Sequence, residues 1–261
     1  MSDLAARWSR SVPSLREAAL RVAYLRAEIA ARPLGAVAGA LDELCGRAEQ
    51  ADPVAREVLS AAVTALADPA ENDLVDALRA IADREALLPL ARLLRRRPRN
   101  EPPPDPPVDE RKLATSSTGR VLTLGERRAL ARRPSRAAFD KLLADPHPMV
   151  VKNLLANPRL TEDDVVRMVA RRPAYPQAIA EVARHAVWSQ RARVRMAIVQ
   201  NPGTPPELSV PLVRLLIRPE LAQLVAAPDV PALVRAAARE LLERRPPVPE
   251  RRDDGEPHEP Q

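Results

Sequence analysis

The sequence predicts an all-α protein whose C-terminal half is a stack of repeated helix pairs, and two observations support this. The first is a self-similar pattern: the apolar segments that end at Asn157-Pro158 and Asn201-Pro202 lie 44 residues apart, and a second apolar segment follows each of them. A period in the forties with two helical patterns per unit is typical of stacked α-helical arrays. The second is composition, because 7 glycines against 29 prolines disfavour hairpins and barrels, whose turns need glycine.

Residues 1–94 are predicted to form an N-terminal domain of five or six helices. From Ser14 to Ala31 apolar residues recur every three or four positions, which is one stripe of an amphipathic helix. Ser14 and Glu17 have the spacing of a capping box, so this helix is expected to start there. A shorter pattern covers residues 34–49, and Asp52-Pro53 opens the next helix. Further periodic segments continue to the end of this half.

Residues 95–118 interrupt the periodic pattern and are predicted to be a linker. Six prolines fall between Pro98 and Pro107 among charged residues, and no apolar periodicity survives there. Proline lacks a backbone donor and favours extended polyproline conformation, so a semi-rigid spacer with little core is expected. The alternative for the same composition is a ligand for an aromatic-lined groove.

A second helical domain is predicted over residues 119–244. Two apolar segments precede the repeat units, and a helix led by threonine follows the Asn-Pro pair in each unit. Thr161 and Thr204 each have an acidic residue three positions later, so both are expected to cap their helices. Short helices punctuated in this way are unstable alone and are expected to stack. Residues 245–261 lack apolar periodicity and are expected to be a disordered tail.

The repeat units resemble two families of α-helical repeats. Asp229…Pro231…Val234-Arg235…Ala237 has the arrangement of HEAT-type repeats, and Asp145…Pro148…Val151-Lys152 follows it less regularly. The Asn-Pro stop followed by a Thr-led helix is similar to the leucine-rich repeat variant. The resemblance covers roughly residues 135–244 and implies a HEAT-like α-α superhelix. Asp52-Pro53-Val54-Ala55-Arg56 is a shorter match in the first half. These motifs are structural and imply no catalytic residue.

The formal charge of +6 is concentrated in the second half. Residues 1–94 carry 11 basic and 14 acidic side chains, whereas residues 119–244 carry 21 and 12. Arginines that cluster in the second half are the candidate residues for binding a partner or a polyanion. They are Arg127, Arg128, Arg132, Arg133, Arg167, Arg171, Arg191 and Arg195. Within the last two pairs of this set the spacing is four, so each pair is expected to share a helix face, and stacked faces would form a basic strip that binds phosphates. A solvated helix surface with inter-repeat Arg–Asp contacts is the other interpretation.

No motif indicates catalysis, because the sequence lacks a Gly-rich phosphate loop, G-x-S-x-G and a paired Cys/His arrangement. Cys45 stands alone and is expected in the core. His147, His185 and His258 have no second ligand at metal-binding spacing. A non-enzymatic protein is therefore expected, with no cofactor, metal or small-molecule substrate.

The N-terminal residues lack the apolar block of a secretory signal. No segment reaches the roughly 18 uncharged apolar residues that a spanning helix needs. A soluble cytoplasmic protein that does not bind a membrane is therefore expected.

Together these observations favour a protein-interaction scaffold or regulatory adaptor that uses an α-solenoid surface to bind another protein. The alternative is nucleic-acid binding through the Arg-rich helices, although the scarcity of aromatic residues disfavours base stacking on single strands. An enzyme of helical-repeat fold is a third possibility, and it would require a pocket with convergent polar groups.

Overall fold

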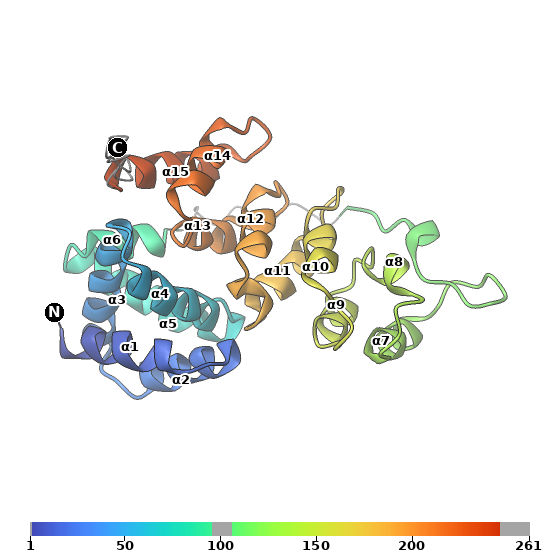
Figure 1. Ribbon diagram of the computed structural model, residues 1–261, viewed down its shortest axis with the longest axis horizontal. Helices are drawn as coiled ribbons and strands as arrows, with labels where there is room; N and C mark the ends of the chain where they lie inside the picture. Colours follow the sequence, from blue (N-terminus) through green and yellow to red (C-terminus); the bar gives the residue numbers. More distant parts are fainter. Residues whose placement is uncertain (1, 96–105, 246–261) are drawn as a thin grey trace, which may run out of the picture.

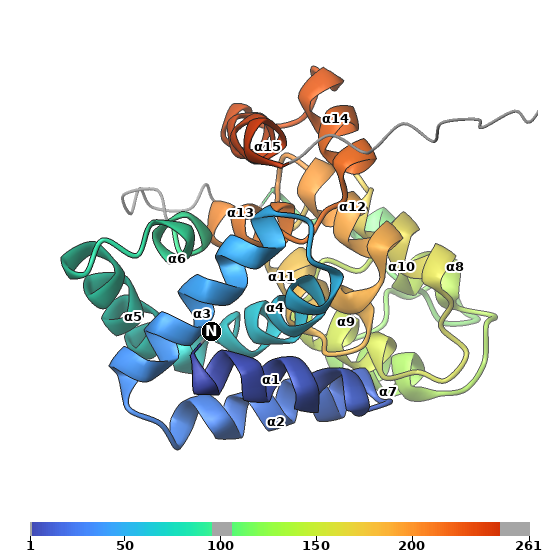
Figure 2. The ribbon, with the colours of Figure 1, turned by 60° about the vertical axis from the view of Figure 1, so that its left-hand side comes forward.

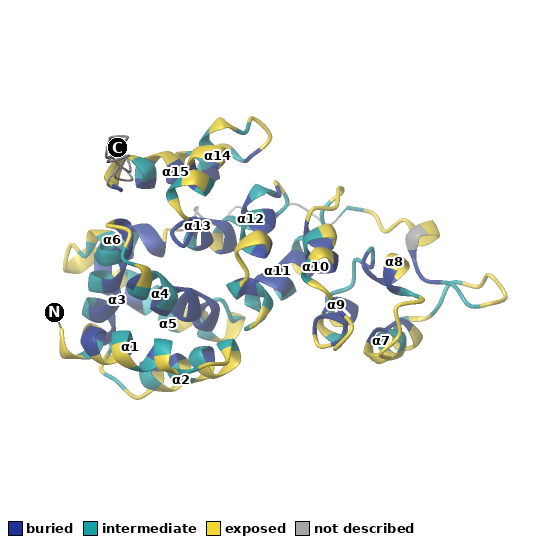
Figure 3. Cartoon of the chain, viewed as in Figure 1, coloured by how far each residue is buried: buried dark blue, intermediate teal, exposed yellow. Residues whose placement is uncertain are grey.

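The computed structural model describes residues 2–95 and 106–245. The regular elements in these ranges are helices, so the described protein is all-α, as predicted. Figure 1 shows an elongated molecule, with the N-terminal helices gathered at one end and α7 and α8 at the other. The described residues contain one isolated β-bridge, between Thr115 and Val121. Figure 3 shows that buried residues occupy the inward faces of helices in both halves.

Among residues 2–95, six α-helices form the first half. They are α1 (Asp3–Ser14), α2 (Ala18–Ala30), α3 (Leu34–Glu49), α4 (Pro53–Leu66), α5 (Asn72–Arg84) and α6 (Leu88–Leu93), with a 3-10 turn η1 (Pro69–Glu71) before α5. Helix α4 packs against α1, α2 and α3 and is buried almost all round. Asp52 caps it as predicted, because Asp52 Oδ1 accepts from the N–H groups of Val54 and Ala55 at 2.9 and 3.1 Å.

The predicted capping box of Ser14 and Glu17 is wrong. Ser14 is the last residue of α1, a helix that the sequence pattern did not reveal, and its hydroxyl donates to Ser11 O at 2.7 Å. Glu17 precedes α2 without a side-chain cap bond. The hydroxyl is therefore used to end one helix, and the next helix starts four residues later than expected.

Within residues 106–245, nine α-helices form the second half. They are α7 (Leu124–Arg132), α8 (Phe139–Leu142), α9 (Pro148–Leu155), α10 (Glu162–Val169), α11 (Pro176–Arg184), α12 (Ala192–Gln200), α13 (Pro206–Val213), α14 (Arg218–Ala226) and α15 (Ala232–Arg244), with 3-10 turns η2 (Glu110–Lys112) and η3 (Trp188–Gln190). Helices α7, α9 and α11 pack in one row, and α10 and α12 pack beside it. This arrangement is compatible with a helical repeat.

Equivalent buried asparagines join successive units. Each is the Asn of an Asn-Pro stop, and its side-chain N–H group reaches two carbonyls at the end of an earlier helix. The bonds run from Asn157 to Ala131 O (2.7 Å) and Arg133 O (2.8 Å), and from Asn201 to Val169 O (2.5 Å) and Arg171 O (3.3 Å). The last carbonyls of a helix have no partner within it. Each asparagine therefore completes a helix of the neighbouring unit while ending its own.

The two Thr-led helices start differently. Thr161 and Asp164 form the predicted capping box: Asp164 N donates to Thr161 Oγ1 at 3.3 Å, and Thr161 N donates to Asp164 Oδ2 at 3.0 Å. The prediction for Thr204 is wrong, because its buried hydroxyl donates to Ile198 O at 2.5 Å and Pro205 is the residue at the N-cap of α13. Thr204 therefore satisfies a carbonyl of α12 and does not cap α13.

Where the structure describes the segments predicted to be linker and tail, both differ from the prediction. Leu113 and Ala114 are buried, and Leu122 N donates to Ala114 O at 2.9 Å, so residues 106–118 do contribute to the core. Arg245, the first residue of the expected tail, is buried at the C-cap of α15. Residues 96–105 and 246–261, on which the rest of both predictions falls, lie outside the described residues.

Buried polar contacts join the two halves. In α4, Ser60 Oγ donates to Gln190 Oε1 at 2.5 Å, and Thr64 Oγ1 accepts from Gln190 Nε2 at 2.9 Å and lies 3.0 Å from Ser189 Oγ. Arg184 Nε donates to the carbonyl that ends α4, Ala67 O, at 3.0 Å. Figure 2 shows α4 facing α11 and α13. The division into domains 1–94 and 119–244 stays a prediction, and the two halves share one hydrophobic core.

Within residues 2–95 and 106–245, no helix combines the length and the apolar character that crossing a bilayer would need. Cys45 is buried in the first half, as predicted for a core residue, and burial raises the pKa of its thiol.

Candidate interaction site

Two of the eight candidate arginines serve the fold. Arg127 is buried, and its Nη1 donates to Asp145 Oδ2 at 2.7 Å. Arg195 is half-buried, and its Nη1 donates to Gln190 O at 2.7 Å. Arg191 is exposed at the N-cap of α12, so Arg191 and Arg195 do not present one exposed face.

Arg167 and Arg171 lie together, but they do not lie on one helix. Helix α10 ends at Val169, so Arg171 follows it. Both side chains reach Asp140: Arg167 Nη1 lies 3.9 Å from Asp140 Oδ1, and Arg171 Nη2 donates to Asp140 O at 3.5 Å. Arg167 Nη2 also donates to Asp164 Oδ1 at 2.6 Å. The contact with Asp140 therefore brings them together where the helix does not.

The remaining four candidates, Arg128, Arg132, Arg133 and Arg191, make no ion pair within the described residues. Arg132 and Arg133 are exposed at the end of α7, whereas Arg128 is half-buried and its Nε has no hydrogen-bond partner. The candidates thus divide into arginines that stabilise the stack and arginines that are free to meet a ligand.

Arginine–aspartate pairs between units were the other interpretation of the arginine clusters, and several are present. Arg193 Nη1 of α12 lies 2.7 Å from Asp163 Oδ1 of α10. Arg136, which precedes α8, donates from both terminal nitrogens to Asp164, at 2.9 and 3.1 Å. The acidic residues at the start of α10 were the sequence signal for these pairs.

Asp164 is the centre of this network. Burial by itself raises the pKa of Asp164, but hydrogen bonds from Arg136, Thr161 and Arg167 outweigh it and hold that pKa well below its usual value. The carboxylate is therefore ionised and held by three partners, which fixes α10 against the segment before α8.

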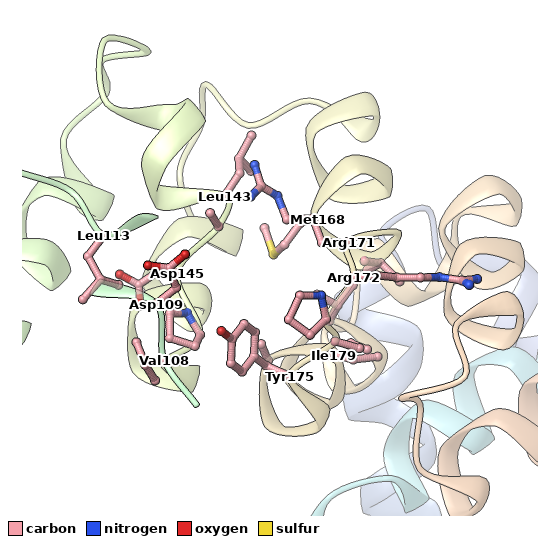
Figure 4. Close-up of a pocket in the computed structure, with 17 residues that line it drawn as sticks. Val108, Asp109, Leu113, Leu143, Asp145, Met168, Arg171, Arg172, Tyr175 and Ile179 are labelled. Carbon is pink, nitrogen blue, oxygen red and sulfur yellow. The ribbon is translucent and has the colours of Figure 1, made fainter. Parts of the chain in front are cut away.

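A narrow pocket with a cavity volume of about 60 Å³ lies beside α10 and α11. Segment 108–113, the loop 143–146, the end of α10 and the turn before α11 surround it. Its walls are mainly apolar: Leu143, Met168 and Ile179 are buried side chains that line it. Figure 4 shows Leu143, Met168 and Tyr175 turned toward the same space. We call this the α10–α11 pocket.

Charged groups flank the α10–α11 pocket on two sides. Asp145 lies on one side, where burial raises its pKa, and a hydrogen bond from His147 N and the charge of Arg127 offset only part of that effect. Arg171 and Arg172 follow α10 on the other side. Asp109 also lines the pocket from segment 108–113, and Asp145 is bonded to Arg127. Arg171 and Arg172 therefore leave a small excess of positive charge at the edge of a mainly apolar pocket.

A second hollow, larger and more open, lies between α10, α12 and α14, with a cavity volume of about 400 Å³. Val166, Met196 and Ala197 form its apolar part, and Arg193 and Gln223 lie along its edges. This hollow follows the side of the stack across three helices.

Sequence reasoning missed the lining of the α10–α11 pocket. Met168 belongs to an apolar pattern that predicts core, Tyr175 falls in no predicted helix, and Val108 and Leu113 fall in the segment predicted to be a spacer. No sequence signal places segment 108–113 against α10 and α11, because this contact depends on how the chain folds back onto the helical stack.

Compared with models of protein families, with curated proteins and with solved structures, the chain has no match in any of the three.

Proposed function

We propose that this chain is a non-catalytic scaffold or regulatory adaptor of the cytoplasm, which binds another protein through the surface of its C-terminal helical stack. The observation that supports this most is the α10–α11 pocket, whose walls are mainly apolar and whose edge carries Arg171 and Arg172, two side chains that make no ion pair within the described residues. A pocket of this kind accepts an apolar anchor of a partner, and a few such anchors carry most of the affinity of an interface. The excess of arginine around it favours a partner that is acidic beside its anchor.

We also infer that the stack is a repeat of the HEAT type or of the leucine-rich repeat variant. What supports this is the Asn-Pro stop: Asn157 and Asn201 make equivalent pairs of bonds to the preceding helix ends. Repeats of this kind present extended surfaces, which suits an adaptor.

The proposal is tested by a charge placed at the mouth of the pocket. Val108 lines the pocket and is 50% exposed, so Val108→Asp leaves the buried walls intact. Leu88→Asp is the matched control, because Leu88 is 62% exposed on α6, which does not line the pocket. We expect partners cross-linked to the wild-type chain and identified by mass spectrometry to be recovered at least about tenfold less with Val108→Asp, which corresponds to one lost anchor. Equal loss with Leu88→Asp, or no loss with either, would contradict the proposal.

The alternative, nucleic-acid binding, is supported by Arg132, Arg133 and Arg191, which are exposed and make no ion pair in the part of the chain that the structure describes. A salt titration with random duplex DNA separates it from protein binding. If these arginines contact phosphates, replacing Arg132 and Arg133 by Ala lowers the slope of log affinity against log salt by about 2. If the chain binds no DNA at low salt, the alternative is removed.

A further inference from the structure

Another apolar pocket lies between the two halves of the chain, where α13 meets α4. Its walls come from α4, α5 and α6 on one side and from α11 and α13 on the other. Figures 1 and 2 both show α13 beside α6. We call this space the junction pocket. Six buried aliphatic side chains line it: Val63, Leu66, Val75, Leu93, Leu208 and Leu212. Walls of this kind favour an apolar occupant.

The junction pocket has the size of a small branched aliphatic group. Its cavity volume is about 50 Å³. One water molecule needs about 10–15 Å³ of such volume, so the space holds about three to five atoms of similar size. The side chains of valine, leucine and isoleucine have this size, whereas an indole ring is too large. The cavity therefore selects a branched aliphatic side chain.

Glu207 brings an unused negative charge to the mouth of the junction pocket. It lies in the first turn of α13, is exposed and lines the pocket. Its spacing from Thr204 predicts a capping box, but Thr204 donates its hydroxyl to Ile198 O instead. Within residues 2–95 and 106–245, the carboxylate of Glu207 makes no hydrogen bond or ion pair. It is therefore free to accept from a cationic group of a ligand.

Arg95 lines the same mouth from the first half and is also exposed. Its Nη1 donates to Glu240 Oε2 at 3.1 Å. Arg214 Nη2 and Arg244 Nη2 each lie 3.7 Å from a carboxylate oxygen of Glu240, so several arginines share this group. A guanidinium has five N–H donors, and Arg95 can therefore bind a second carboxylate beside Glu240.

The other carboxylate of this network is Glu49, and it is shared as well. Glu49 accepts two bonds from Arg92, at 2.8 and 2.6 Å, and lies 3.4 Å from Arg214 Nη1. Four arginines thus share two carboxylates, which leaves a surplus of two positive charges. The mouth of the junction pocket is therefore positive on the side of the first half and negative at α13.

We propose that the junction pocket binds a free α-amino acid with a branched aliphatic side chain, of which leucine is the representative. The side chain fills the apolar cavity, the ammonium group donates to Glu207, and the carboxylate accepts from Arg95. Because the ligand contacts both halves, its binding fastens one to the other. This inference stands apart from the α10–α11 pocket, which is proposed for a protein partner.

The test is a ligand titration of the full chain followed by saturation-transfer NMR. We expect saturable binding of L-leucine with a Kd of about 1 mM or lower, from burial of the side chain and two ion pairs at the mouth. L-Alanine, which buries fewer carbon atoms, should bind at least about tenfold more weakly. L-Valine and L-isoleucine in the same series identify the side chain that fills the cavity best.

Three analogues of leucine test the charges of the ligand. 4-Methylpentanoate lacks the ammonium group, 3-methylbutylamine lacks the carboxylate, and N-acetyl-L-leucine amide lacks both charges and stands for a leucine within a protein. We expect each to bind at least about threefold more weakly than L-leucine. Binding of the amide as tight as that of L-leucine would assign the pocket to a side chain of a partner protein and overturn the proposal.

Variants of the two charged residues test the protein side of each contact. Glu207→Gln should weaken binding of L-leucine at least about threefold and leave that of 4-methylpentanoate unchanged, because this analogue has no ammonium group. Arg95→Gln should weaken binding of L-leucine and leave that of 3-methylbutylamine unchanged. Glu162→Gln is the matched control, since Glu162 lies in the first turn of α10 and does not line the junction pocket. It should bind L-leucine as the wild-type chain does.

The proposal is overturned if L-leucine shows no saturable binding up to about twentyfold the expected Kd, or if Glu207→Gln and Glu162→Gln bind it equally well. Should a variant fail to fold, as seen by circular dichroism, the ligand series on the wild-type chain decides alone. Equal affinities for L-leucine and its two singly charged analogues then overturn the proposal.

Discussion

At the scale of single residues, Asn157 and Asn201 show how one side chain can end its own helix and complete another. Each amide donates to two carbonyls of an earlier helix end, and its oxygen accepts an N–H from two residues further on, that of Arg159 or Gly203. Gly203 cannot be replaced by a residue with a side chain unless its surroundings shift, because a Cβ there would lie 2.4 Å from Ala174 Cβ. The close approach of Ala174 therefore requires glycine at this position, whereas the bond to the asparagine does not, since Arg159 makes the equivalent bond to Asn157.

We expect Asn201→Ala to lower the free energy of unfolding by about 1–3 kcal/mol, because it leaves buried carbonyls without donors. This corresponds to a fall of roughly 2–12 °C in the midpoint of thermal unfolding. Asn153→Ala is the control, since Asn153 is half-buried and its single bond, to Arg128 O, is long at 3.5 Å. Equal shifts for the two variants would show that the bonds of Asn201 do not stabilise the stack.

Asp164 makes stability depend on pH in the acid range. Its pKa in the folded chain lies below the usual 3.8, so the folded state favours the ionised form. The stabilisation is present above the unfolded pKa and is lost as the pH falls through that value and below it. We expect the urea midpoint of the wild-type chain to fall from about pH 5 downward, and the slope to be shallower in Asp164→Asn.

Asp140→Asn provides the control for this pH series, because Asp140 is 93% exposed. Its acid slope should match that of the wild-type chain. A slope that Asp164→Asn leaves unchanged would assign the acid sensitivity to other carboxylates.

At the scale of helices and turns, local chemistry could be predicted where one residue decides it. Asp52 before Pro53 and Thr161 before Asp164 mark helix starts that the structure reproduces. Ser14 and Thr204 carry the same kind of signal, but each gives its hydroxyl to a carbonyl of the preceding helix. A cap residue that follows a helix closely can serve either neighbour, and the sequence alone does not say which.

The difference between Asp52 and Ser14 can be measured. Asp52→Ala removes bonds to two N–H groups of α4 and a contact with Arg47 at 2.7 Å, so we expect a loss of about 0.5–2 kcal/mol in the free energy of unfolding. Ser14→Ala removes one exposed bond at a helix end and should change stability by less than about 0.5 kcal/mol. Urea unfolding followed by circular dichroism gives both values. A loss of stability in Ser14→Ala as large as that in Asp52→Ala would support the prediction that Ser14 caps the following helix.

The candidate site was harder to predict than the helices, for a physical reason. Periodicity reports which face of a helix is apolar, and it identified the buried sides of α9, α10 and α12. Periodicity does not report which helices a non-periodic segment packs against, so the contact of Val108 and Leu113 with the helical stack was missed. Charge count alone also did not separate Arg127, which is buried against Asp145, from the exposed Arg132.

At the scale of the whole molecule, the shared core and the contacts of Gln190 with α4 indicate that the halves unfold together. Trp8 lies buried in the first half, and Trp188 lies in the turn that meets α4, where its Nε1 donates to Leu155 O at 2.9 Å. Each tryptophan therefore reports on a different half.

We expect Trp8 fluorescence, measured in Trp188→Phe, and circular dichroism of the same variant to give one coincident unfolding transition in urea, because buried contacts couple the halves. Trp188→Phe keeps an aromatic ring but loses the pyrrole part of the indole and its hydrogen bond to Leu155 O, so a uniform shift of the midpoint is acceptable. Two separate midpoints would show that the halves are thermodynamically independent.

The asparagine bonds between units also bear on how such an array can lengthen or shorten. A gene duplication or deletion that cuts between residues 131 and 157 separates Asn157 from the two carbonyls to which it donates. The end of α7 then keeps carbonyl groups without a hydrogen-bond donor. A cut that keeps an asparagine together with its acceptors preserves both ends. Viable changes of repeat number therefore have to fall outside these bonded intervals, so the modular unit of this protein is the interval from acceptor to asparagine rather than the helix pair.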